Sequence, residues 1–267
     1  MAAIEIKTVQ TDGFEMEYFC FGHGKEPLVI LPGLSVQSVM GAADAVADAY
    51  RLLTDAFTLY VFDRRRDLPA VYSMKEMAQD TAEAIRALGL GLVCLFGTSQ
   101  GGMAAMLIAV KYPALVRRLV LGSTSARITE PESALFEGWI NLARAGDARG
   151  LYLAFGEAVY PPEVFERSRQ LLADAAVTVT GEELRRFVIL AKTVIGFDVI
   201  DEVERIACPV LVIGSRDDRV LGGDASVQIA ARLRGKSAAL FLYDSYGHAA
   251  YDTAPDYKER LLRFLVS

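Results

Sequence analysis

The chain has 267 residues, of which 52% are hydrophobic and 23% charged, and its formal net charge is −6 with a pI of about 5.1. This composition is typical of a well-packed globular protein. The lack of a long basic run argues against nucleic acid and anionic membrane surfaces as partners. The longest apolar run, MAAMLIAV at 103–110, is far shorter than the roughly 20 residues of a membrane-spanning helix.

Cysteine and histidine usage narrows the chemistry further. Cys20, Cys94 and Cys208 are widely spaced, and each lies in or beside an apolar run. Together with an N-terminus that lacks the pattern of a signal peptide, they predict reduced thiols and a cytoplasmic location. With two histidines in the chain and no CxxC or HExxH motif, neither a metal nor another cofactor is expected.

The first half of the chain alternates between strand and helix patterns. Strands are expected at 3–10, 14–21, 27–33, 57–63, 92–97 and 117–123. Between them, helices are expected at about 38–54, at 73–89 and from 103 to Pro113. The helix at 73–89 opens with a capping box formed by Ser73 and Glu76. Because continuous apolar strands are covered on both faces, the pattern predicts an α/β fold with a mostly parallel central sheet flanked by helices.

The alternation stops at about residue 128 and resumes near 205. Between these points the sequence predicts helices alone, at 132–146, 147–160, 161–175 and 180–197. A strand (209–218), a helix (about 224–234), a strand (238–244) and a final helix (255–265) then follow. We therefore expect a core of residues 1–127 and 205–267 with a helical cap inserted at 128–204. The alternative is one domain that carries extra helices on one face.

The segment GTSQGG, residues 97–102, lies between the expected strand at 92–97 and the helix that follows. A sharp turn from strand to helix exposes a serine hydroxyl and leaves the next N–H at a helix N-terminus. Such a turn requires small flanking residues, and Gly97 and Gly101 meet that requirement. The sequence therefore predicts Ser99 as a nucleophile; the alternative is a glycine-rich turn with a capping hydroxyl.

With these features the chain resembles the α/β-hydrolase superfamily, in its capped and esterase-like form, over roughly residues 14–127 and 197–267. The resemblance implies a triad in the order nucleophile, acid, histidine. The G-x-x-D pattern at 214–217 matches Asp217 to the acid, with its neighbour Asp218 as the alternative. His248, in the loop after the last strand, matches the base. His23 precedes the serine, and we interpret it as a solvated turn residue.

The resemblance also implies an oxyanion hole made by two backbone N–H groups, those of Gln100 and Leu34. Relatives often have His-Gly where this chain has Pro32-Gly33, so a side chain that usually steadies the loop is missing. The alternative for this segment is an ordinary turn at the end of a strand.

Two further groups of residues remain open at this level. In the run DRRR (63–66), Arg65 matches the arginine of the family pattern D-x-R-G-x-G, whereas the glycines are absent. Arg64, Arg65 and Arg66 either form a rim that recognises an anion or lie in a solvated loop with one structural arginine, which we favour. In the cap, Trp139 and Phe136 are candidates for the wall of an apolar substrate pocket.

These features predict a cofactor-independent serine hydrolase that cleaves a small carboxylic ester, lactone or thioester through an acyl-enzyme. The substrate partner would carry a small apolar or aromatic acyl group. The same triad also serves carbon–carbon bond hydrolases and perhydrolases. From another class, a ligand-binding receptor with slow or no turnover remains an alternative, because fold does not determine function. The sequence leaves the oligomeric state open.

Overall fold

The computed structural model describes residues 3–233, 235 and 237–267. It contains one eight-stranded sheet with the order β1-β2-β4-β3-β5-β6-β7-β8. The strands are β1 (Ile6–Gln10), β2 (Glu15–Gly22), β3 (Glu26–Leu31), β4 (Phe57–Arg65), β5 (Val93–Thr98), β6 (Val116–Gly122), β7 (Val210–Ser215) and β8 (Ala238–Tyr243). β2 runs antiparallel to both β1 and β4, and the other neighbours are parallel. The expectation of a mostly parallel α/β sheet is confirmed.

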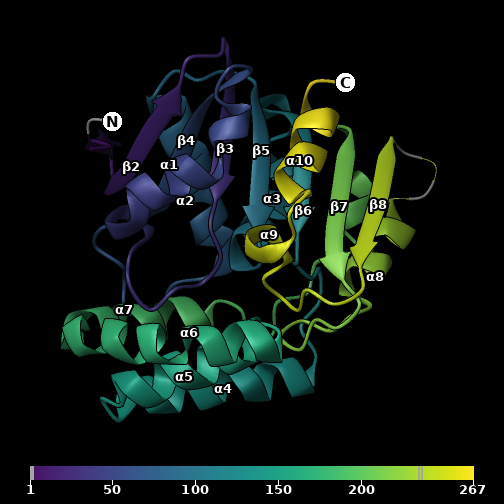
Figure 1. Cartoon of the computed structure of the whole chain (residues 1–267). Helices are drawn as coiled ribbons and strands as arrows, with labels where there is room; N and C mark the ends of the chain where they lie inside the picture. Colours follow the sequence, from purple (N-terminus) through teal and green to yellow (C-terminus); the bar gives the residue numbers. More distant parts are fainter. Residues whose placement is uncertain (1–2, 234, 236) are drawn as a thin grey trace.

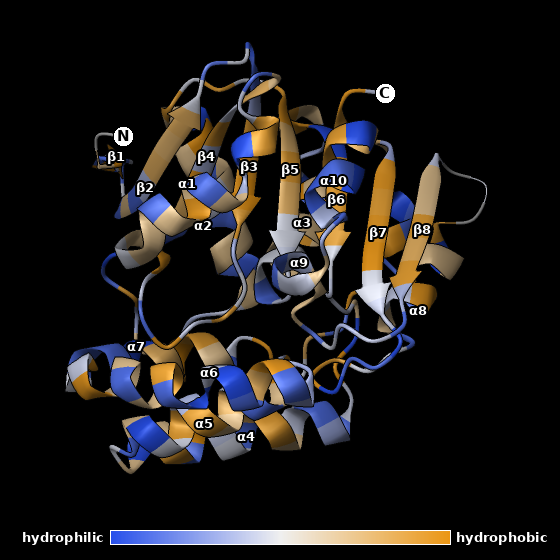
Figure 2. Ribbon diagram, viewed as in Figure 1, coloured by the Kyte–Doolittle hydropathy of each residue, from blue (hydrophilic) through white to orange (hydrophobic). Residues whose placement is uncertain are grey.

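Helices cover both faces of this sheet. They are α1 (Ala43–Ala49), α2 (Met74–Ala87), α3 (Gln100–Lys111), α8 (Ala225–Arg232), α9 (Ala250–Thr253) and α10 (Tyr257–Leu265). Buried side chains of α2, α3 and α8 belong to one apolar cluster, whereas those of α1, α9 and α10 belong to a second cluster. Figure 2 shows the central strands as almost continuously hydrophobic, which is expected where a parallel strand is covered on both faces.

Two local expectations differ from the structure. The segment expected as one helix at 38–54 is broken into a 3₁₀ turn at Val39–Ala42, the short α1, and another 3₁₀ turn at Arg51–Leu53. Such short 3₁₀ pieces are common connectors at helix ends. The short helix α9 was not expected from the sequence. The expected helix at 224–234 is α8, and its last expected residue lies outside the described residues.

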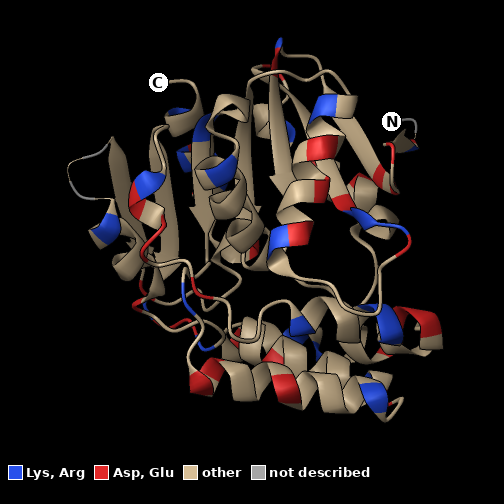
Figure 3. Ribbon diagram, turned by 180° about the vertical axis from the view of Figure 1, so that it is seen from behind, with Lys and Arg blue, Asp and Glu red and all other residues tan. Residues whose placement is uncertain are grey.

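Four helices lie between β6 and β7 in the chain. They are α4 (Glu130–Arg144), α5 (Ala148–Val159), α6 (Pro162–Ala175) and α7 (Gly181–Lys192). Figure 1 shows this group, in green, as a layer across the carboxyl ends of the parallel strands. Figure 3 shows that charged residues are frequent on these helices and on surface loops, and sparse on the central strands. That this layer is a cap with the bounds 128–204 stays a prediction.

Among the helices that the structure describes, none combines the length and apolar character needed to cross a membrane.

Because a thiol is buried in this core, we expect the stability of the fold to decrease at alkaline pH. Burial raises the pKa of Cys94, on the central strand β5, to about 11. The folded protein therefore keeps the thiol proton of Cys94 at a pH where the unfolded chain releases it. The contribution of Cys94 to stability is fully present below about pH 9 and is lost as pH rises toward 11. Between pH 8 and pH 10 we expect Cys94 to lower the free energy of unfolding by about 1 kcal/mol.

Urea unfolding at pH 8 and pH 10 measures this effect. Cys94→Ser should show a smaller fall in stability between the two pH values than wild type, because a hydroxyl does not ionise in this range. Cys20→Ser, at a half-buried strand position, is the control and should keep the wild-type fall. An equal fall in wild type and Cys94→Ser contradicts the prediction.

Candidate active site

Ser99 occupies the turn between β5 and α3 in a strained backbone conformation. Its φ is 50° and its ψ is −122°, a backbone region that residues other than glycine rarely adopt. Two hydrogen bonds hold the turn. The Ser99 N–H donates to the carbonyl oxygen of Gly122 (2.9 Å), and the Thr124 hydroxyl donates to the Ser99 carbonyl oxygen (2.7 Å). The serine is thereby fixed at the carboxyl edge of the sheet, where α/β folds generally bind their ligands.

The glycines around Ser99 are required by close packing. A Cβ on Gly97 would lie 2.4 Å from the Gly101 carbonyl oxygen, and a Cβ on Gly101 would lie 2.1 Å from the carbonyl oxygen of Leu31. In the loop after β3, a Cβ on Gly33 would lie 3.1 Å from the Cβ of Ser99. The expectation that the positions flanking the serine must be small is therefore confirmed, and the loop after β3 lies directly against it.

A buried histidine and carboxylate lie at the same edge of the sheet. His248 is 2% exposed and follows β8, and its Nδ1 lies 2.8 Å from Oδ2 of Asp218, which is 8% exposed. The other oxygen of Asp218 accepts hydrogen bonds from the backbone N–H groups of Val220 (2.8 Å) and Leu221 (3.0 Å). These two bonds fix the orientation of the carboxylate that contacts the imidazole.

The prediction that Asp217 contacts the histidine is wrong, and its neighbour Asp218 takes that place. Asp217 is exposed, and its Oδ1 accepts hydrogen bonds from the Ser215 hydroxyl (2.5 Å) and the Gly247 N–H (3.0 Å). The turn after β7 is thus one residue longer than the G-x-x-D match assumed. Asp217 holds the backbone of the histidine loop, whereas Asp218 reaches the ring.

The two residues expected to supply an oxyanion hole are both buried beside Ser99. Leu34 is 8% exposed and lines the same small cavity as Ser99, and Gln100 is the first residue of α3, where N–H groups are free of intrahelical partners. The side-chain Nε2 of Gln100 donates to the Leu190 carbonyl oxygen (2.8 Å) and to the Thr193 hydroxyl (3.1 Å) of the helical layer. These bonds tie the start of α3 to the end of α7.

A narrow apolar cavity joins the serine and the histidine. Both line a space of about 10 Å³, room for about one water molecule. Phe136 and Trp139, the cap residues named from the sequence, line the same space and are each 2% exposed. Their rings meet at a centroid distance of 4.9 Å. The structure therefore brings these two aromatic residues together with Ser99 and His248.

A larger cavity of about 790 Å³ adjoins the narrow one between the sheet edge and α5. The two cavities share the wall residues Gly33, Leu34, Phe155, Val159 and Tyr251. The shared wall is mainly apolar, and the carboxylates of Glu183 and Asp252 lie elsewhere in the lining of the larger cavity. Among the described residues that line it there is no lysine or arginine.

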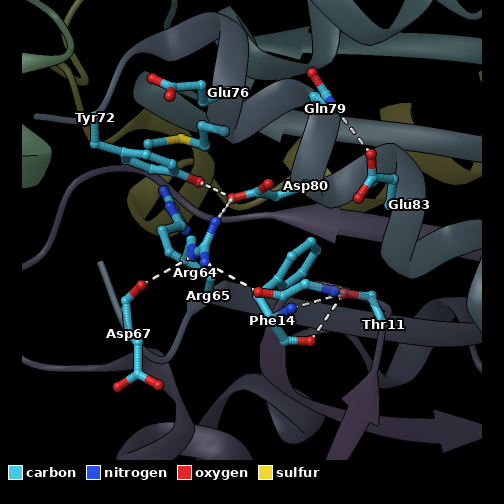
Figure 4. A network of polar contacts seen from close by, with 12 residues as sticks. Thr11, Phe14, Arg64, Arg65, Asp67, Tyr72, Glu76, Gln79, Asp80 and Glu83 are labelled. Atoms are coloured by element: carbon cyan, nitrogen blue, oxygen red, sulfur yellow. Dashed lines mark hydrogen bonds and ion pairs between the residues drawn. The ribbon is translucent and has the colours of Figure 1, made fainter. Parts of the chain in front are cut away.

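The three arginines of DRRR have separate structural partners. The guanidinium of Arg65 lies 3.7 Å from the carboxylate of Asp80 and over the ring of Phe14 (Figure 4). The same carboxylate accepts a hydrogen bond from the Tyr72 hydroxyl (2.7 Å). Arg66 pairs with two glutamates of β2 at the surface. These contacts agree with structural roles for Arg65 and Arg66 and do not form an anion-binding rim.

Arg64 differs from both neighbours because it is buried, with 7% of its surface exposed, and it contacts the loop after β3. Sequence analysis did not connect Arg64 with the site. Period-two alternation along β4 places it on the same face as the buried Phe62, and this is the signal that could have found it. Thr124, which holds the Ser99 carbonyl, carried no comparable signal. His23 is exposed and pairs with Asp55 (3.2 Å), as expected for a solvated turn residue.

Comparison with known proteins places most of the chain in a family of hydrolases. The model of the alpha/beta hydrolase family matches residues 28–257. The putative carbamate hydrolase RutD of Caulobacter segnis is 28% identical over 252 residues, which cover 91% of this chain and 92% of that protein. The human serine hydrolase BPHL is 26% identical over 219 residues, which cover 79% of this chain and 69% of that protein.

Solved structures share the fold. The alpha/beta hydrolase MGS-M2 from a Medee basin deep-sea metagenome library superposes with a TM-score of 0.87 at 21% identity, over 98% of both chains. The enol-lactonase of Burkholderia xenovorans superposes with a TM-score of 0.83 at 19% identity, over 98% of this chain and all of that chain. The resemblance inferred from the sequence motifs is confirmed by these findings.

The strain at Ser99 can be tested without an assay of activity. Glycine adopts the backbone conformation at this position freely, whereas alanine keeps the strain. We expect Ser99→Gly to be more stable than Ser99→Ala by about 1 kcal/mol in urea unfolding. At Ser168, in the middle of α6, the same pair of substitutions should give the opposite order, since glycine weakens a helix by about 1 kcal/mol relative to alanine. The same order at both positions contradicts the strain argument.

Proposed function

The chain belongs to the alpha/beta hydrolase family, and from that premise we propose that it is a cofactor-independent serine hydrolase acting through an acyl-enzyme. The match to the family model and the similarity to proteins named as hydrolases support a hydrolase activity in general. The observation that carries the finer proposal is that Ser99 and His248 line one narrow cavity at the edge of the sheet, while the buried Asp218 carboxylate contacts the imidazole of His248.

In the proposed reaction, the Ser99 hydroxyl attacks the carbonyl carbon of the substrate while Nε2 of His248 takes the hydroxyl proton. The contact between Asp218 and Nδ1 supports this assignment, because it places the other ring nitrogen free to act as the base. The histidine then returns the proton to the leaving group. Water attacks the acyl-enzyme in the second half of the reaction, with the same histidine as base and Ser99 as the leaving group.

The N–H groups of Leu34 and Gln100 are proposed to bind the negative oxygen that forms at each attack. The burial of both residues against Ser99 supports this role. The apolar wall shared by the two cavities supports a substrate with a small apolar or aromatic acyl group, as an ester, lactone or thioester, with Trp139 and Phe136 in contact with it. Because several relatives are named putative carbamate hydrolases, carbamates belong in the substrate panel.

Substitution of the two neighbouring aspartates separates their roles. Asp218→Asn should lower kcat by about 10⁴-fold, because loss of this carboxylate leaves the imidazole in the wrong tautomer. Asp217→Asn keeps an oxygen that can accept from the Gly247 N–H, so we expect kcat within about 10-fold of wild type. Steady-state kinetics on a p-nitrophenyl ester measures both. A larger loss in Asp217→Asn than in Asp218→Asn contradicts the assignment of the acid.

A series of p-nitrophenyl esters from acetyl to octanoyl, together with a p-nitrophenyl carbamate, tests the activity itself. We expect repeated turnover by wild type and a loss of about 10³-fold or more in Ser99→Ala, since the nucleophile is removed. The preferred chain length then reports how far the acyl group enters the cavity. Wild type that is inert, or that stops after one equivalent of p-nitrophenol, favours the receptor alternative over an esterase.

A further inference from the structure

A buried arginine from β4 forms hydrogen bonds with the loop that carries the Leu34 N–H, one of the two proposed oxyanion-hole donors. The Nη2 nitrogen of Arg64 lies 2.7 Å from the carbonyl oxygen of Pro32, 3.2 Å from that of Gly33 and 3.0 Å from Oε1 of Gln100. A cation is expensive to bury unless strong hydrogen bonds compensate it. Burial lowers the pKa of the Arg64 guanidinium, which nevertheless stays protonated at neutral pH.

The contact with the Gly33 oxygen determines where the Leu34 N–H points. The carbonyl of Gly33 and the N–H of Leu34 belong to the same peptide group, which is planar and trans, so the two bonds point in opposite directions. When Arg64 holds the oxygen, the hydrogen is turned to the side away from the guanidinium. Leu34 lines the Ser99 cavity, and Gly33 packs against the serine. The hydrogen bond also polarises the peptide group, which makes its N–H a stronger donor.

The loop itself has few other anchors at this point. Pro32 has no N–H and no side chain that can donate, so its carbonyl is the polar group by which it can be held. Through the third contact, Arg64 links this loop to the side chain of Gln100, whose own N–H is the second proposed donor. One guanidinium therefore joins the two segments that must be in register for both donors to reach one oxygen.

Arg64 is in turn held by its neighbour. Its backbone N–H donates to Oδ1 of Asp63 (2.7 Å), and the same carboxylate pairs with Arg186 of α7 (3.2 Å) and accepts from the Ser38 hydroxyl (2.6 Å). These contacts fix the end of β4 against both the loop after β3 and the helical layer. The backbone from which the Arg64 side chain extends is thus held in place.

We propose that Arg64 is the positioning residue of the oxyanion hole, which orients the N–H of Leu34 and keeps it in register with that of Gln100. It does not touch the substrate. This inference rests on the proposed serine-hydrolase function and adds to it the group that substitutes for the missing side chain at Pro32. Its effect belongs to the transition state, because the donors are needed most when the oxygen carries charge.

The test compares Arg64→Met and Arg64→Lys with the control variant Arg65→Met. Arg65 is the adjacent arginine, which pairs with Asp80 and lies outside both cavity linings. We expect Arg64→Met to lower kcat by about 10²-fold, with KM within about three-fold of wild type, because a misplaced donor weakens transition-state binding. Arg64→Lys should recover part of kcat, since an ammonium can hold one carbonyl. Arg65→Met should keep kcat within about three-fold, and thermal midpoints of all variants report any general loss of stability.

A pair of inhibitors gives a readout that a merely structural role would not move. An alkyl trifluoromethyl ketone forms a charged tetrahedral adduct with the serine, whereas the matched methyl ketone binds as a neutral carbonyl compound. In Arg64→Met and Arg64→Lys, the affinity for the trifluoromethyl ketone should fall by the same factor as kcat/KM, and the affinity for the methyl ketone should stay unchanged.

Several outcomes overturn the inference. They are kcat within three-fold of wild type in Arg64→Met, an equal loss in Arg65→Met, and a parallel fall in affinity for both ketones. If Arg64→Met does not fold, the same comparison in Arg64→Lys decides. Failure of the proposed function looks different, because wild type itself would then neither hydrolyse the esters nor bind the trifluoromethyl ketone, and both proposals would be withdrawn.

Discussion

The strained backbone of Ser99 is the constraint on which the rest of the site depends. A residue with a side chain stays at φ 50° only when its surroundings hold it there. Here β6 accepts its N–H, Thr124 donates to its carbonyl oxygen, and two glycines allow α3 and β3 to approach within distances that no Cβ would permit. The sheet and the turn hold the Ser99 hydroxyl in one orientation at the narrow cavity, below the helical layer.

Some of the polar contacts between the core and the helical layer lie next to this turn. Gln100 bonds to the end of α7, and Asp63 pairs with Arg186 on the same helix. The side chain of Gln100 therefore contacts both the helical layer and Arg64, next to the proposed donors. Electrostatic interactions are stronger where protein replaces water, so a helical layer over the proposed substrate pocket would also strengthen the proposed oxyanion hole.

Sequence reasoning predicted the order and type of nearly all elements, because long apolar runs separated by clear turn and capping signals leave few alternatives. It also predicted Ser99 and His248 as residues of one site, and the structure places them around one cavity. It was wrong by one position about the aspartate that contacts His248. Two adjacent aspartates satisfy the same motif, and only the path of the turn after β7 decides which of them faces the ring. The break in the helix expected at 38–54 was also missed.

The sequence by itself determined the strands of the sheet and the glycines of the turn at Ser99, because these depend on local patterns and spacing. Tertiary structure decided that Asp218 contacts His248, and that Arg64, from another strand, holds the loop before Leu34. The physical reason is that the direction of a side chain at the end of a strand, and the partner of a buried charge, depend on residues distant in the chain. Local patterns carry no record of those contacts.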